Sequence, residues 1–124
     1  MKIGFLIATT LIAIASKDGC HKSKSSTSFK GRLEIKGICM NYTIKVLEGN
    51  IDKSLIEDKW TDETTGKSYT DVFALGSRCT FPASIDQGEE FTFMIDTAQV
   101  QNCAVCLAYY PTPSKHLSIK VLDK

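Results

Sequence analysis

The sequence predicts an all-β domain, either a small antiparallel barrel or a β-sandwich, built from about six strands. Three observations predict this class. Short segments with alternating apolar and polar residues recur from residue 29 to the end of the chain, and clusters of turn-forming residues separate them. No segment in this range shows a convincing apolar stripe of helical period, although residues 51–58 have room for a helical turn.

The first strand is predicted to run from Phe29 to Glu48. Leu33 and Ile35 alternate with charged neighbours, and after Gly37 the apolar positions shift by one residue. A period-two pattern that slips at a glycine is typical of a β-bulge, which bends a long strand around a small barrel. A kinked first strand followed by shorter ones therefore favours an OB-like barrel, with the sandwich as the alternative.

Five further strands are predicted between the turn-forming clusters. They are Leu55–Thr61, Ser68–Leu75, Glu90–Ile95, Cys103–Tyr110 and Leu117–Val121. The first two flank the turn-forming residues Asp62–Lys67, so they are expected to form a hairpin, with Gly66 suited to a positive φ. The segment Cys103–Tyr110 is apolar and short, which predicts a buried strand that ends at Pro111 and Pro113.

The first 19 residues have the features of a signal peptide. Lys2 supplies a positive start, and Ile3–Ala15 is an apolar run shorter than the roughly 20 residues that a membrane-spanning helix needs. We expect residues 1–19 to be removed. The alternative is cleavage after Ala15, where small residues would suit a signal peptidase and would release a soluble secreted or periplasmic chain.

The sequence at the expected cleavage point is Gly19-Cys20, followed by His21-Lys22-Ser23-Lys24. This junction resembles the start of mature lipoproteins, particularly those of Bacteroidota-type bacteria. The resemblance implies that Cys20 carries the lipid and anchors the chain to a membrane of the cell envelope, outside the cytoplasm. Residues 20–28 are then a flexible tether, and residues 29–124 form one domain.

The charge of this domain argues against nucleic-acid binding. Residues 29–124 contain 11 Lys and Arg against 13 Asp and Glu, while the lysines of the tether make the whole chain nearly neutral. A domain that binds phosphates should carry a basic surface. The mildly acidic domain therefore predicts no nucleic-acid partner.

The cysteine count supports export. If Cys20 is acylated, Cys39, Cys79, Cys103 and Cys106 remain, an even number that predicts two disulfides in a small exported domain. All three pairings are open at this stage. A zinc site is disfavoured, because one CxxC with two isolated cysteines is half of the usual signature.

The residues give little support to catalysis, and no cofactor is expected. Cys103 and Cys106 have the spacing of a redox motif, so a thiol–disulfide oxidoreductase is the alternative, but no Lys, Arg or His lies between them to lower a thiol pKa. His116 is expected at an exposed edge, and the acidic pairs fall at turns. No glycine-rich phosphate loop is present.

Binding is the function that the sequence favours, and aromatic residues are the candidates. Trp60, Tyr109 and Tyr110 are predicted to contact a ligand or partner, such as an envelope protein or a glycan, with at least one of the adjacent tyrosines exposed. We expect Trp60 or Tyr110 to lie on an exposed aromatic patch. A third class, a secreted inhibitor or accessory subunit, would present an exposed loop such as Asp62–Lys67 or Pro111–Ser114.

Overall fold

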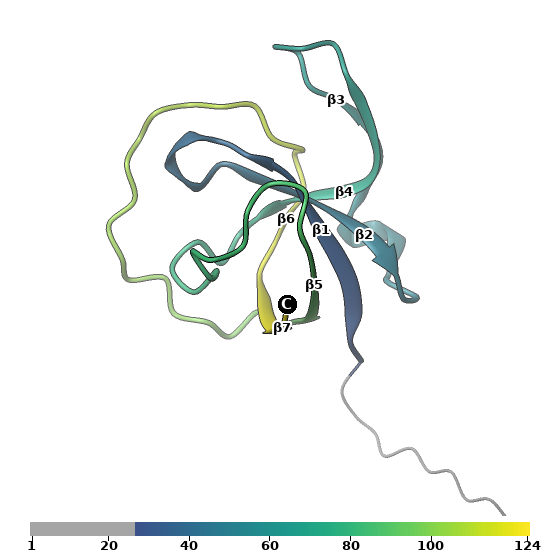
Figure 1. Ribbon diagram of the computed structural model, residues 1–124, viewed down its shortest axis with the longest axis vertical. Helices are drawn as coiled ribbons and strands as arrows, with labels where there is room; N and C mark the ends of the chain where they lie inside the picture. Colours follow the sequence, from purple (N-terminus) through teal and green to yellow (C-terminus); the bar gives the residue numbers. More distant parts are fainter. Residues whose placement is uncertain (1–26) are drawn as a thin grey trace, which may run out of the picture.

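The computed structural model describes residues 27–124 and confirms the all-β prediction (Figure 1). The expected signal peptide, Cys20 and most of the tether lie outside these residues. Seven strands form one sheet: β1 Phe29–Lys36, β2 Tyr42–Glu48, β3 Glu57–Thr61, β4 Ser68–Leu75, β5 Glu90–Ile95, β6 His116–Leu117 and β7 Ile119–Asp123. Two single-turn 3-10 helices, η1 at Ile38–Met40 and η2 at Lys53–Leu55, interrupt them. No helix among the described residues is long and apolar enough to cross a membrane.

The strands pair in the order β3-β4-β2-β1-β5-β7. The C-terminal segment contacts two parts of this sheet, because β7 pairs with β5 antiparallel while β6, just before it, pairs with β4 in parallel. The sheet therefore curls around a single core. It does not close into a barrel, since the β4–β6 ladder has only two residue pairs and β3 lies outside it. The result is a curled, sandwich-like arrangement.

The prediction of one long strand from Phe29 to Glu48 is wrong. The chain reverses at η1, so that β1 and β2 form an antiparallel hairpin. Cys39 and Met40 take positive φ values of 59° and 61° there. The phase shift at Gly37 thus marks a reversal. A side chain at Gly37 would lie 2.5 Å from the carbonyl oxygen of Asn41, which explains the glycine.

The predicted buried strand Cys103–Tyr110 is also absent. These residues belong to an irregular segment between β5 and β6, and most of them are exposed. Figure 1 shows this yellow-green segment as a wide arc along one side of the domain. Short apolar runs are ambiguous in sequence, and here small residues such as Ala104 and Ala108 form a run that no neighbouring strand pairs with.

The hairpin predicted around Asp62–Lys67 is confirmed as β3–β4. Lys59 pairs with Thr70 and Trp60 with Tyr69, and Gly66 at the turn has φ +78°. In Figure 1 this hairpin projects from the body as an arm at the top of the view. The last predicted strands are confirmed as β5 and as the pair β6 and β7.

The core lies inside the curl of the sheet and is rich in phenylalanine. Alternate residues of β1 are buried, including Leu33, and they meet Ile44 of β2. Phe73, Phe91 and Phe93 are fully buried, and their rings contact one another or further phenylalanines at 5.5–5.9 Å between centroids. Each such ring contributes about 1.5–3 kcal/mol by leaving water. This core fixes the strands from which the exposed loops start.

Candidate functional site

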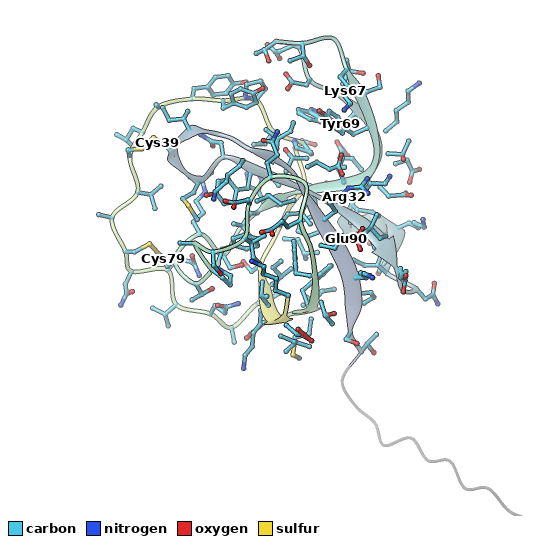
Figure 2. All side chains as sticks on the ribbon, viewed as in Figure 1. Arg32, Cys39, Lys67, Tyr69, Cys79 and Glu90 are labelled. Carbon is cyan, nitrogen blue, oxygen red and sulfur yellow. A yellow bond between two sulfur atoms is a disulfide. The ribbon has the colours of Figure 1, made fainter. Side chains whose placement is uncertain are left out.

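Two disulfides hold the long segment between β5 and β6 to the rest of the domain. Cys39 bonds to Cys106 and Cys79 to Cys103, with Cα atoms 5.2 and 5.5 Å apart. Each cysteine of the CxxC pair is therefore bonded to a different segment, one to the β1–β2 turn and one to the β4–β5 connection. Figure 2 shows Cys39 and Cys79 on the same side of the domain, facing the arc of the segment. We name residues 97–109 the disulfide loop.

Hydrogen bonds add to these covalent links. The backbone N–H of Cys103 donates to Cys79 Sγ at 3.1 Å, and the N–H of Cys79 donates to Gln101 Oε1 at 3.0 Å. Asn41, next to η1, donates through Nδ2 to the carbonyl oxygen of Ala108 at 2.9 Å. The disulfide loop is thus attached at several points although it lacks strand pairing.

Apolar side chains on and beside the disulfide loop face solvent. Leu107 is 97% exposed, Tyr109 77%, Val100 71% and Ile38, in η1, 57%. Ile38 and Leu107 each adjoin a cysteine of the Cys39–Cys106 bridge, so the bridge brings their backbone positions near one another. We name Ile38, Leu107 and Tyr109 the apolar patch. Exposed apolar side chains that are grouped in this way mark interaction surfaces on soluble domains.

Tyr110 anchors the far end of the disulfide loop to a buried carboxylate. Its hydroxyl donates to Asp62 Oδ2 at 2.8 Å, while the N–H and hydroxyl of Thr64 donate to Asp62 Oδ1 at 2.8 and 2.7 Å. Burial raises the pKa of Asp62, but these hydrogen bonds outweigh burial and leave the pKa below its ordinary value. The carboxylate therefore stays ionised and links the β3–β4 arm to the loop.

The candidate aromatic residues have different environments. Tyr109 is exposed, which confirms that at least one of the adjacent tyrosines faces solvent, whereas Tyr110 is half-buried. Trp60 is also half-buried and packs on Tyr69 across the β3–β4 hairpin, with ring centroids 5.8 Å apart. Burial, followed by the nearby charges of Asp62 and other groups, raises the pKa of Tyr69. Trp60 and Tyr110 are neither buried nor fully exposed.

Of the two loops proposed for an inhibitor, Asp62–Lys67 is exposed over most of its length and Pro111–Ser114 is not. Within Pro111–Ser114 both prolines are buried. Ser114 Oγ donates a hydrogen bond to Glu57, and the carbonyl of the next residue, Lys115, accepts one from the N–H of Ala74. This segment is not a presented loop. Residues 63–67 are exposed, but Asp62 is buried.

Sequence reasoning missed Leu107, Ile38 and Asn41. The sequence pattern predicts a buried strand around Leu107 and a long strand with Asn41 in its interior. The CxxC pair is a signal that could have indicated an exposed loop here. If its two cysteines each bond to a different distant segment, the disulfides hold the short stretch around them, and that stretch needs no strand partners. The sequence alone left the pairing open, so this argument could not be completed.

Other parts of the described chain are weaker candidates for a functional site. His116 lies exposed at its predicted edge, and no group of three or more His, Cys, Asp or Glu in residues 27–124 could hold a metal ion. Two open surface hollows, of about 410 and 210 Å³, share Glu48 and Gly49 in their linings. Neither is lined by a histidine or a cysteine.

The fold and the loop define a class: a small, disulfide-linked all-β domain that presents an exposed apolar loop. Two disulfides indicate an extracellular or other oxidising environment. In the comparisons with known proteins, no family model, curated protein or solved structure matches the chain.

Proposed function

We propose that this chain is an exported, lipid-anchored domain of the cell envelope that binds a partner protein through the disulfide loop and does not catalyse a reaction. The observation that carries the proposal is the exposure of Leu107 and Tyr109 on a loop attached by two disulfides. An exposed apolar loop is a stability liability unless something covers it. A loop that is already ordered also loses little conformational entropy on binding, which favours recognition.

A protein partner is favoured over a glycan. The aromatic pair on the β3–β4 arm, Trp60 and Tyr69, is half-buried. The two most exposed positions of the apolar patch are Leu107 and Tyr109, and an aliphatic anchor such as Leu107 suits the apolar core of a protein interface.

Site-specific photo-crosslinking in the native cells tests the binding. A benzophenone amino acid at Leu107 or Tyr109 should give one discrete crosslinked protein band. The same amino acid at Leu122, which is 47% exposed on β7, is the matched control and should give none. Equal labelling at all three positions, or none at any, contradicts the proposal.

Anchoring has its own test. Intact-mass spectrometry of the membrane-extracted protein should give a chain that begins at Cys20 with added acyl groups. Cys20→Ala should move the protein to the soluble fraction. A mass that corresponds to an unmodified chain beginning at Ser16 would show free secretion.

The alternative of a thiol–disulfide oxidoreductase receives no support from the disulfide pairing. A redox CxxC motif cycles between a dithiol and a disulfide within the motif, whereas Cys103 and Cys106 bond to Cys79 and Cys39. Thiol labelling after mild reduction tests this directly, because an oxidoreductase would show one reactive thiol ahead of the others.

A further inference from the structure

The segment around Leu107 combines exposure with support on both sides. Cys106, just before it, is bonded to Cys39, and the carbonyl of Ala108, just after it, accepts a hydrogen bond from Asn41 Nδ2 at 2.9 Å. The same Nδ2 donates to the carbonyl of Ile38 at 2.8 Å, while Arg78 Nη2 donates to Asn41 Oδ1 at 3.2 Å. Asn41 is thus held in place and spaces the loop from the β1–β2 turn.

The disulfide loop has an irregular backbone. No residue from 97 to 109 has a positive φ, belongs to a strand or lies in a helix. The side chain of Leu107 is almost fully in solvent, and Tyr109, two residues later, is 77% exposed. The loop therefore offers an accessible length of chain with an apolar side chain two residues before its end.

Serine endopeptidases act on accessible chain segments of this kind. They bind an extended segment with one side chain in the S1 pocket, which is an apolar slot in chymotrypsin and contains an acidic residue in trypsin. When a protein holds such a segment in its bound form beforehand, little entropy is lost and the complex is tight. Interfaces of this kind form with small backbone changes. A leucine suits the apolar slot.

Resting on the proposed binding function, we propose that residues 105–109 are an inhibitory segment that enters the active-site cleft of a serine endopeptidase with an apolar S1 pocket. Leu107 fills the pocket, Tyr109 contacts the cleft beyond the Leu107–Ala108 bond, and Ile38 extends the contact from the other side of the bridge. The partner chemistry is thereby specified: an apolar S1 pocket beside a cleft that accepts an extended chain.

The attachments on both sides of the Leu107–Ala108 bond also explain why the segment would inhibit the protease and would not be digested by it. Hydrolysis of the Leu107–Ala108 bond would add one water, leaving a carboxylate on Leu107 and an ammonium group on Ala108. Both new ends would stay in position, because Cys106 is bonded to Cys39 and Tyr110 is hydrogen-bonded to Asp62. A retained amine next to the acyl group favours resealing over release.

Inhibition of purified proteases by the processed, oxidised protein tests the inference. The wild type should inhibit chymotrypsin and subtilisin stoichiometrically and leave trypsin active. Leu107→Lys should transfer inhibition to trypsin and weaken chymotrypsin inhibition by roughly 100-fold or more. Leu122→Lys, the same charge change at an exposed leucine on β7 and outside the loop, is the matched control and should alter neither.

Two results overturn the inference. One is a wild type that inhibits neither chymotrypsin nor subtilisin while Leu107→Lys leaves trypsin active. The other is rapid, complete cleavage at Leu107–Ala108. Circular dichroism and disulfide mapping of each variant confirm folding. If crosslinking at Leu107 still gives a discrete partner, the proposed binding function stands although this inference fails; if crosslinking fails too, both fall.

Discussion

The carboxylate of Asp62 shows how one buried residue joins two exposed segments. It accepts hydrogen bonds from Thr64 in its own turn and from Tyr110 at the end of the disulfide loop. A buried acceptor that loses its donor costs about 1–3 kcal/mol. The β3–β4 arm and the disulfide loop are therefore expected to be coupled in stability.

Tyr110→Phe tests that coupling. The variant keeps the ring and removes the hydroxyl donor, so we expect the free energy of unfolding to fall by about 1–3 kcal/mol in urea denaturation. Tyr109→Phe is the matched control, because Tyr109 is exposed and its hydroxyl makes no hydrogen bond within residues 27–124. Its loss should be within about 0.5 kcal/mol. Equal effects in the two variants would contradict the account.

The contribution of Asp62 to folding stability depends on pH because its pKa is lowered in the folded state. Because the folded-state pKa lies below the unfolded-state value, the carboxylate stabilises the fold above the unfolded pKa, and this stabilisation is lost as pH falls through the folded pKa. The stability difference between wild type and Asp62→Asn should therefore be constant above about pH 5 and shrink as the pH falls below the ordinary pKa of an aspartate, about 4. Denaturation at a series of pH values measures it, and a difference that grows on acidification would be contrary to expectation.

Substitutions at two glycines with positive φ distinguish the cost of backbone strain from the cost of a steric clash. Gly49 has φ +115°, and a Cβ there would lie 2.5 Å from Phe29 Cδ1; Gly66 has φ +78° and open space around it. Gly49→Ala should therefore destabilise more than Gly66→Ala, which incurs the backbone cost of about 1 kcal/mol alone. Thermal denaturation of both variants measures the two losses of stability. A larger loss for Gly66→Ala would contradict the packing of Phe29 against Gly49.

At the scale of elements, the two disulfides differ in the length of chain that they close. Cys39–Cys106 spans 67 residues and Cys79–Cys103 spans 24. In the chain-entropy model these closures stabilise by about 4 and about 3 kcal/mol respectively. The double variant Cys39→Ala/Cys106→Ala should therefore unfold at lower urea concentration than Cys79→Ala/Cys103→Ala. The reverse order would show that local contacts outweigh loop closure.

The elements that the sequence predicted correctly are those fixed by local chemistry. The β3–β4 hairpin follows from a turn-forming cluster with Gly66, and β5 follows from alternating phenylalanines. The errors at Phe29–Glu48 and Cys103–Tyr110 have a different origin. In each, a distant contact decides the structure: the Cys39–Cys106 bridge holds the reversal of the first segment and keeps the second outside the sheet.

At the scale of the whole molecule, the candidate site depends on those same distant contacts. The cysteines, Tyr109 and Tyr110 were identifiable from their residue types. Leu107 and Ile38 were not, because a leucine and an isoleucine in apolar runs are more often buried, and their exposure depends on the bridge beside them. Asn41 acquires its role only when Ala108, 67 residues later, comes into hydrogen-bonding distance.

The account rests on a disulfide loop that is exposed and yet ordered, and backbone ¹⁵N relaxation of residues 103–109 measures this most directly. In the oxidised protein we expect order parameters of about 0.8 in these residues. In Cys39→Ala/Cys106→Ala they should fall below about 0.6, while the order parameters of β1 and β5 stay unchanged. Order parameters below about 0.6 in the oxidised wild type would contradict the account, because a mobile loop could not serve as a preorganised binding surface.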